Sequence, residues 1–329
     1  TRRSSDLMED AAAGSMEQEE PKVQIGLSFD SFVIERWMRE RDVFVSAAKE
    51  LGAEVNVQNA NGDVQDQISQ IEYFIRKQVD VIVVVAGDCE ALTDVMIKAR
   101  EAGIKTVSYD RLIQNAGCDL YISFDNTEVG RLMARSLLEN IPDGGDIFLI
   151  QGPLTDHNVT LVREGIDETL AGSSLSVVYE SNCAGWVAEN AYTYTKEGLK
   201  QDRYVKGIIC GNDDLASQAF RALSEERLAG KVYVTGQDGD LAACQRIVEG
   251  TQEMTAFKSV EQEASMAAKC AVLLGLGEEI EEARSTAYDG TYQVPYLELQ
   301  PIAVTGENMD EVIIKGGFHA KEDVYLNVN

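Results

Sequence analysis

The chain has 329 residues, of which 44% are hydrophobic and 26% charged, a composition typical of a globular protein long enough for two domains. Its 29 basic and 56 acidic residues give a formal charge of −27 at pH 7, which argues against binding to nucleic acid or to an anionic membrane surface. Six cysteines without C-x-x-C spacing and only two histidines argue against structural zinc, and we expect neither a metal nor a cofactor.

Residues 1–21 are predicted to form a flexible acidic tether. The first 20 residues hold six acidic side chains and no apolar periodicity. The chain starts at Thr1 instead of Met, so we expect that an N-terminal signal or lipid anchor has been removed. No apolar run reaches the roughly 18–20 residues of a membrane helix. The N-terminal segment by itself leaves open whether the protein carries a membrane tether.

From Lys22 onward, short apolar runs typical of strands alternate with amphipathic segments typical of helices. Two series of strands are predicted, at 23–28, 54–58, 80–85, 105–108 and 121–124, and then at 146–150, 175–179, 205–210, 231–235 and 252–257. The helices between and after them are predicted near 34–51, 64–78, 89–102, 127–140, 159–171, 188–200, 213–228, 239–249 and 259–275. The end of the chain differs, with short strands predicted at 297–304 and 311–314.

Apolar strands that alternate with helices are typical of parallel sheets covered on both faces. Two such series predict an α/β fold of two doubly wound lobes. Ligands of these sheets bind beyond the carboxyl ends of the strands, so the loops that follow the strands are the place to expect a site.

Polar and aromatic side chains recur in these loops. The candidates for ligand binding are Arg36, Trp37, Asp110, Arg111, Asn158, Trp186, Asn212, Asp238 and Lys258. Together they supply the donors and acceptors that neighbouring sugar hydroxyls need. A structural alternative stands beside each: Asn212 can cap a helix, and Arg36 or Arg111 can form ion pairs between lobes.

Trp37 and Trp186 are the only tryptophans, and each falls in a different series. An arbitrary tryptophan is more often a core residue than a ligand contact. An aromatic ring can nevertheless cover the C–H face of a sugar. With their polar neighbours considered, we predict that the two rings form the sides of a sugar clamp that is complete only when the two lobes close.

The sequence gives little support for a role as an enzyme. Phosphate-binding, nucleophile-elbow and zinc-protease motifs are absent. Asp110 and Asp238 could in principle form a glycosidase pair, but Arg111 and Lys258 nearby would keep both carboxylates ionised and leave no general acid. We therefore expect no catalytic residues.

Several long motifs resemble the type I periplasmic sugar-binding proteins of ABC transporters, in particular those that bind D-xylose. They are IERWMRERDVF at 34–44, VQNANG at 57–62, SYDRLI at 108–113, YISFDNTEVG at 121–130, GNDD at 211–214, GQDGDLAA at 236–243, GTQEMTAFK at 250–258 and IKGGFH at 314–319. The resemblance covers about Lys22 to His319. Two segments depart from the family pattern: His157 stands where an Asn is more usual, and 86–89 reads Ala-Gly-Asp-Cys instead of a Pro-Tyr-Asn type segment.

The resemblance implies sugar contacts from the same nine candidates and two lobes joined by three crossovers, near Asp125-Asn126, Phe257-Lys258 and Val294-Pro295. An N-terminal lobe of 22–125 and 258–294 and a C-terminal lobe of 126–257 and 295–329 are then expected. The resemblance further implies a periplasmic or extracytoplasmic location, with or without a membrane tether. The implied function is capture of a monosaccharide, an aldopentose and foremost D-xylose, by a monomer that presents its closed form to a transporter permease. A sensor role toward a membrane kinase ectodomain or chemoreceptor is the alternative. A DNA-binding repressor with this fold would need an N-terminal helix-turn-helix, for which residues 1–21 are too short and too acidic.

Overall fold

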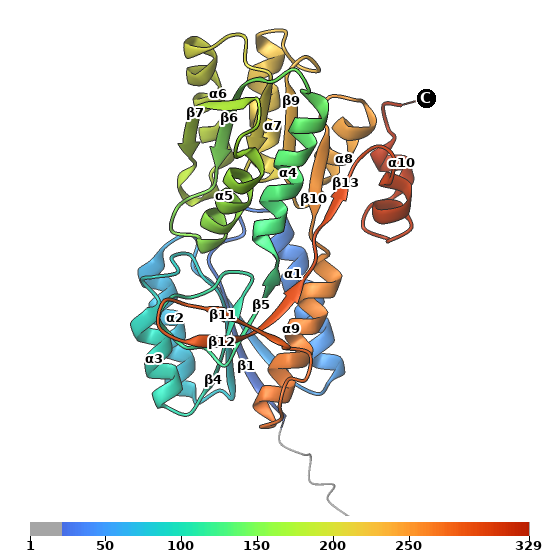
Figure 1. The fold of residues 1–329 in the computed structure, drawn as a ribbon. Helices are drawn as coiled ribbons and strands as arrows, with labels where there is room; N and C mark the ends of the chain where they lie inside the picture. Colours follow the sequence, from blue (N-terminus) through green and yellow to red (C-terminus); the bar gives the residue numbers. More distant parts are fainter. Residues whose placement is uncertain (1–21, 329) are drawn as a thin grey trace, which may run out of the picture.

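The computed structural model describes residues 22–328 and contains two α/β lobes, one above the other in Figure 1. The predicted tether at 1–21 lies outside the described residues. Each lobe is built around its own mainly parallel sheet, as the alternation of apolar strands and helices predicts. The prediction of two doubly wound lobes is confirmed.

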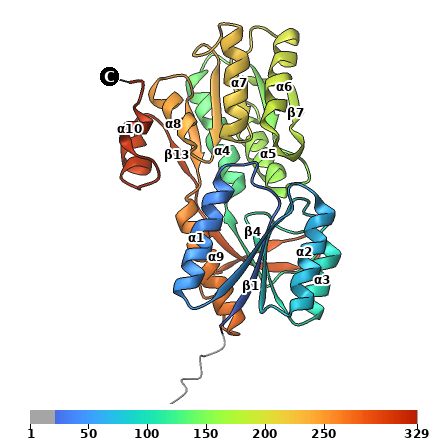
Figure 2. The same ribbon diagram turned by 180° about the vertical axis from the view of Figure 1, so that it is seen from behind.

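The first lobe holds a seven-stranded sheet among the described residues, in the order β11-β12-β5-β4-β3-β1-β2. Its strands are β1 (Gln24–Phe29), β2 (Glu54–Asn59), β3 (Val81–Val85), β4 (Lys105–Tyr109), β5 (Leu120–Phe124), β11 (Ser285–Tyr288) and β12 (Gln293–Leu299). Its helices are α1 (Arg36–Glu50), α2 (Val64–Lys77), α3 (Thr93–Glu101) and α9 (Val260–Gly275). Helices α1 and α9 cover one face, and α2 and α3 cover the other (Figure 2). Strand β3, which lies inside the sheet between β4 and β1, is therefore buried along its whole length.

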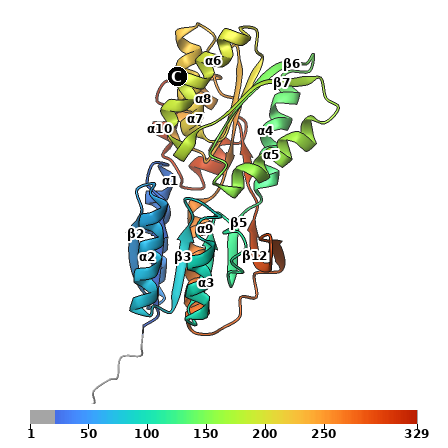
Figure 3. The ribbon, with the colours of Figure 1, turned by 90° about the vertical axis from the view of Figure 1, so that its left-hand side faces the viewer.

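The second lobe holds a six-stranded sheet within residues 22–328, in the order β13-β10-β9-β8-β6-β7. Its strands are β6 (Gly145–Gln151), β7 (Leu175–Asn182), β8 (Gly207–Cys210), β9 (Tyr233–Gln237), β10 (Met254–Phe257) and β13 (Ile302–Val304). Its helices are α4 (Asn126–Asn140), α5 (His157–Leu170), α6 (Ala188–Gln201), α7 (Asp213–Glu225), α8 (Leu241–Val248) and α10 (Lys321–Val324), with short turns η1 (Ala184–Trp186) and η2 (Asp310–Ile314). Figure 3 shows this lobe above the strand ends of the first.

Within residues 22–328 the chain passes between the two sheets at three places. The first two lie between β5 and α4 and between β10 and α9, where they were predicted. The prediction of a third crossover at Val294-Pro295 is wrong, because both residues lie in β12, which pairs with β5 and β11. The chain leaves the first sheet only after Leu299 and enters the second at Ile302. The predicted lobe boundary at 295 therefore falls inside a strand of the first lobe.

Two other predictions near the end of the chain are corrected by the structure. The single strand predicted at 297–304 is two strands in different sheets, interrupted at Gln300-Pro301, where proline removes a ladder donor. The strand predicted at 311–314 is the helical turn η2, in which Ile313 is buried against the second lobe. Helix α2 begins at a side-chain cap, since the Asp63 carboxylate accepts hydrogen bonds from the backbone of Gln65 and Asp66.

Helices α4 and α5 touch through two glycines. A Cβ atom added to Gly165 would lie 1.9 Å from the Thr127 carbonyl oxygen, and one added to Gly130 would lie 2.0 Å from the Val162 carbonyl oxygen. Because both obstacles are backbone atoms, a larger residue at either position would force the helices apart.

We therefore expect Gly165→Ala to lower the free energy of unfolding by about 1–3 kcal/mol, although alanine favours helix formation elsewhere. Urea unfolding measures the change. Gly306→Ala is the matched control, because an added Cβ there would have 4.0 Å to its nearest atom. Equal stability of Gly165→Ala and the control would show that the helices can separate without cost.

No helix within the described part of the chain is both long and apolar enough to cross a membrane. All six cysteines lie in this part, and each is a buried free thiol.

Candidate functional site

A cavity lies between the two lobes, at the carboxyl ends of strands from both sheets. Its walls contain all nine side chains proposed from the sequence. The lining residues are Ile34, Arg36, Trp37, Asp110, Arg111, Gln151, Asp156, Asn158, Val159, Val162, Trp186, Gly211, Asn212, Gln237, Asp238 and Lys258. We call the expectation that ligands bind beyond the carboxyl ends of the strands the strand-end rule. It selected residues that surround one cavity although they are up to 222 positions apart in the sequence, from Arg36 to Lys258.

Both lobes contribute to the walls. Arg36 and Trp37 begin α1, and Asp110 and Arg111 follow β4 in the first lobe. Asn158 lies in the first turn of α5, Trp186 in η1, Asn212 at the start of α7 and Asp238 after β9, all in the second lobe. Lys258 stands at the crossover between β10 and α9. A ligand in this cavity would contact both lobes at once.

The two tryptophans are buried and also line the cavity, with exposed fractions of 2% for Trp37 and 6% for Trp186. The guanidinium carbons of Arg36 and Arg111 lie 4.7 and 5.4 Å from the Trp37 ring centroid. The Trp186 indole nitrogen donates to Asp156 Oδ2 at 3.1 Å. Each tryptophan is therefore both a buried residue of its lobe and a part of the cavity wall, so a structural role and a ligand contact are compatible.

Three cavity residues have a strained backbone. Asp110, Trp186 and Asp238 have φ values of 62°, 58° and 99°, a region that side chains other than glycine seldom adopt. Such strain persists only where surrounding contacts impose it, and it concentrates at ligand sites. Here it directs two carboxylates and one indole toward the same space.

Many polar atoms in the cavity walls are buried without a hydrogen-bond partner among residues 22–328. They include the acceptors Asp110 Oδ1, Asn158 Oδ1 and Gln237 Oε1 and the donors Arg36 Nε, Gln151 Nε2 and Asn212 Nδ2. Unpaired buried polar groups are costly, and each calls for an explanation. A small ligand that both donates and accepts hydrogen bonds along its length would satisfy this mixed set.

Asn212 serves two purposes. Its Oδ1 accepts a hydrogen bond from the Leu215 backbone and so caps α7, as the structural alternative predicted. Its Nδ2 has no hydrogen-bond partner within the described chain, and Asn212 is part of the cavity wall. The cap thus fixes the amide in an orientation that leaves one donor for a ligand.

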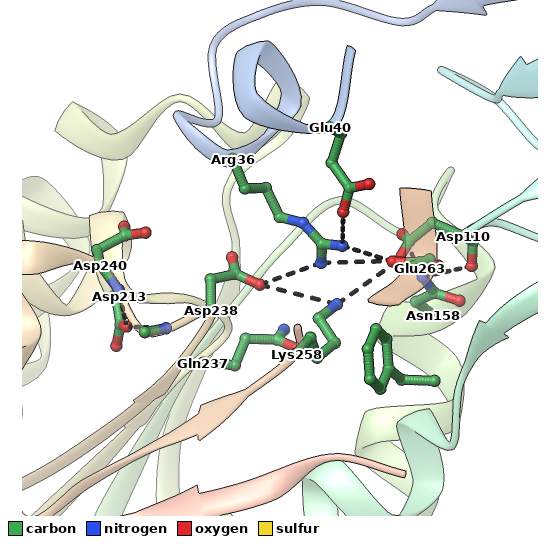
Figure 4. Close-up of polar contacts among 12 residues, drawn as sticks. Arg36, Glu40, Asp110, Asn158, Asp213, Gln237, Asp238, Asp240, Lys258 and Glu263 are labelled. Carbon is green, nitrogen blue, oxygen red and sulfur yellow. Dashed lines mark hydrogen bonds and ion pairs between the residues drawn. The ribbon is translucent and has the colours of Figure 1, made fainter. Parts of the chain in front are cut away.

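Two carboxylates from different lobes share two cations in the cavity (Figure 4). Arg36 Nη1 lies 3.7 Å from Asp110 Oδ1 and 3.4 Å from Asp238 Oδ1, and Lys258 Nζ lies 3.6 and 3.8 Å from the same two atoms. Burial raises the pKa of Asp110, but Lys258, Arg36 and Arg111 outweigh it and hold that pKa below its usual value. Asp110 is therefore an ionised acceptor, not a proton donor.

An ion pair and two hydrogen bonds also join the lobes directly around the cavity. Arg111 lies 3.1 Å from Asp30 Oδ2 in its own lobe and 2.9 Å from Asp156 Oδ2 in the other. Asn158 Nδ2 donates to the main-chain oxygen and to Oδ2 of Asp110, both at 3.0 Å. The structure is thus a closed form in which the lobes meet over the cavity.

The two segments that depart from the family pattern lie next to this closure. The Ala86 carbonyl oxygen accepts a hydrogen bond from Arg111, and the Cys89 backbone nitrogen donates to the Thr155 oxygen in the opposite lobe at 3.0 Å. His157 begins α5 beside Asp156 but does not line the cavity. Residues 86–89 therefore support Arg111 and the contact between the lobes.

Comparison with known proteins identifies the family. The model of the periplasmic binding protein domain matches residues 25–279. The chain belongs to this family. Among curated relatives, the D-xylose-binding periplasmic proteins of Haemophilus influenzae and Escherichia coli are 43% and 40% identical. Each match covers 92% of this chain, and 92% and 93% of the respective relative.

Solved structures of other binding proteins have the same fold. An ABC transporter solute-binding protein from Clostridium phytofermentans with bound β-D-glucose superposes with a TM-score of 0.84 at 25% identity. That match covers 92% of this chain and 99% of the other. The arrangement of two sheet lobes around a central cavity is therefore that of periplasmic binding proteins of known structure.

Sequence reasoning missed several buried polar residues of this binding protein. Gln151 and Gln237 end strands β6 and β9 and line the cavity, so the strand-end rule could have included them. Asp156, the N-cap of α5, also lines the cavity but was not among the nine proposed residues. Glu40 and Glu263 lie behind Arg36 on helices, where an acidic residue normally indicates a solvated face, and no sequence signal distinguished them.

Proposed function

We propose that the chain is an extracytoplasmic solute-binding protein that captures an aldopentose, D-xylose foremost, between its lobes and presents the closed form to an ABC transporter permease. The observation that carries the proposal is a set of hydrogen-bond donors and acceptors without partners, which belong to residues of both lobes that line one cavity. The D-xylose-binding relatives from H. influenzae and E. coli support the choice of sugar.

The chemistry of the walls suits a pyranose. Each sugar hydroxyl donates one hydrogen bond and accepts others, which matches a wall of carboxylates, amides and guanidinium groups. The apolar C–H faces of the ring would lie against Trp37 and Trp186. Asp110, Asp238 and Lys258 would bind hydroxyls as charged partners, and Arg36, Arg111, Asn158 and Asn212 would complete the contacts.

Ligand binding of this kind requires no bond breaking, and we propose that the protein is not an enzyme. Of the two carboxylates considered as a catalytic pair, Asp110 has a lowered pKa and so does not suit the role of general acid. Binding instead shifts the population from an open form to the closed form, because only the closed form places both walls against the sugar.

Calorimetric titration of the protein with D-xylose, D-ribose, L-arabinose, D-glucose and D-galactose tests the proposal. We expect D-xylose to bind with the highest affinity, in a 1:1 complex, with a dissociation constant in the micromolar range or below. The absence of binding to every one of these aldoses at millimolar concentration would refute it.

Sugar affinity should fall as pH rises. Burial, followed by Asp238 and by Glu35 of the opposite lobe, raises the pKa of Asp214 to about 6. Opening the lobes would hydrate Asp214 and remove Glu35, so its pKa would drop and closure would take up protons. Because the sugar favours the closed form, we expect D-xylose to bind several-fold more tightly at about pH 5.5 than at about pH 7.5.

Titrations at both pH values, with Asp214→Asn as the comparison protein, measure this dependence. The variant cannot take up the proton and should show a weaker pH dependence than the wild type. An affinity that increases with pH in the wild type would contradict the assignment.

A further inference from the structure

Arg36 is held from behind by two buried carboxylates. Its Nη2 donates to Glu40 Oε1 at 2.5 Å and to Glu263 Oε2 at 2.7 Å (Figure 4). Glu40 lies one turn further along α1 and Glu263 lies in the first turn of α9, so both belong to the same lobe as Arg36. Both side chains are completely buried.

The other terminal nitrogen of Arg36 faces the cavity with looser contacts. Nη1 lies 3.4 Å from Asp238 in the opposite lobe and 3.7 Å from Asp110. The short contacts thus come from α1 and α9, while the contacts on the cavity side are long enough to be replaced by ligand hydroxyls. The orientation of the guanidinium group is therefore set within one lobe and does not depend on closure.

Glu40 is itself fixed, since it accepts a hydrogen bond from the buried hydroxyl of Tyr109. Tyr109 ends β4 immediately before the cavity residue Asp110. A chain of hydrogen bonds from Tyr109 through Glu40 and Arg36 to Glu263 therefore connects strand β4, helix α1 and helix α9. We call Glu40 and Glu263 the rear clamp.

Stability alone does not account for the rear clamp. Two carboxylates behind one guanidinium leave excess negative charge in the interior, and a buried ion pair is often no more stable than an apolar replacement. Glu263 Oε1 also has no hydrogen-bond partner among residues 22–328. Burial, Asp110 and Glu40 raise the pKa of Glu263 well above its ordinary value, which reflects this cost.

We propose that Glu40 and Glu263 are positioning residues, which hold Arg36 in its sugar-binding orientation before the lobes close. This inference rests on the proposed function. A flexible arginine loses side-chain entropy when it is fixed on a ligand, and the rear clamp removes that loss from the binding step. Neither Glu40 nor Glu263 lines the cavity, so both would act on the sugar only through Arg36.

A double-mutant cycle tests the inference. The rear clamp is removed by Glu40→Gln combined with Glu263→Leu, and the same pair is introduced into an Arg36→Lys protein, which keeps the buried positive charge. We expect the clamp variant to bind D-xylose about tenfold more weakly than the wild type. In the Arg36→Lys protein, the same pair of substitutions should lower the affinity for D-xylose by less than about threefold. Calorimetry gives the affinities.

Urea unfolding of each protein separates positioning from folding. We expect the clamp variant to be at least as stable as the wild type, because it relieves buried like charge. If the pair of substitutions prevents folding, Glu263→Gln alone is compared, with a smaller loss of affinity expected in the same direction. Glu311→Gln, which breaks an exposed ion pair with Lys315, is the matched control and should leave the affinity unchanged.

Two results would overturn the inference. The first is wild-type affinity in the clamp variant, or in Glu263→Gln where only that protein folds. The second is an equal loss in the wild-type and Arg36→Lys backgrounds, which would mean that the carboxylates do not act through Arg36. Both leave the proposed function intact, whereas the absence of aldose binding by the wild type would overturn the proposed function as well.

Discussion

Arg111→Gln should weaken D-xylose binding more than any other single substitution at the cavity, by about 3–5 kcal/mol. Arg111 is almost completely buried and joins Asp30 of its own lobe to Asp156 of the other. Without the guanidinium group, closing the lobes would bury Asp156 without its cation. The cost therefore falls on the closed form, and it corresponds to at least about a hundredfold in the dissociation constant.

Calorimetry with D-xylose measures this loss, and circular dichroism of the free protein checks that the variant is folded. Arg135→Gln is the matched control, since Arg135 pairs with Glu128 on the surface of α4. The control should bind like the wild type. An affinity of Arg111→Gln within threefold of the wild type would mean that the ion pair between the lobes contributes nothing to closure.

Trp186→Ala should have the second-largest effect, on the order of 1–3 kcal/mol in sugar affinity. The Trp186 ring packs against Gly152 and Gly211, where an added Cβ would come within 2.3 and 3.1 Å of it, and its indole nitrogen donates to Asp156. The alanine variant loses both the stacking surface and the hydrogen bond. Trp186→Phe keeps a ring and should lose less.

Titration of both variants distinguishes a ligand contact from a core residue. If Trp186 is only structural, unfolding experiments will show a loss of stability while the affinity for D-xylose remains that of the wild type. That result would remove one side of the proposed sugar clamp.

The sequence predicted most of the fold because apolar strands and amphipathic helices alternate regularly up to Gly275. Strand β3, Val81–Val85, consists of five β-branched residues that are all buried, and its short length and β-branched side chains indicate a strand and not a helix. Predictions failed near the end of the chain, where pairing partners are distant in sequence. Nothing local indicates that Leu297 pairs with Ile122 in the first sheet while Ile302 pairs with Phe257 in the second.

The same distinction applies to the site. The nine proposed residues follow strands or begin helices, so a local rule found them, and they all line one cavity. Glu263 could not be found in this way, because its partner Arg36 is 227 positions away and only the packing of α1 on α9 brings them together. The strained backbone of Asp238 could not be predicted either, because an aspartate at this position does not indicate a φ of 99°.

Small-angle X-ray scattering of the wild-type protein with and without saturating D-xylose tests most directly whether one monosaccharide is held by both lobes together. Because the sugar contacts would come from both lobes, its binding should shift an open population to the closed form. We predict a smaller radius of gyration with D-xylose and a scattering curve that fits the closed structure. Identical curves with and without the sugar, neither of them fitting the closed structure, would contradict the claim.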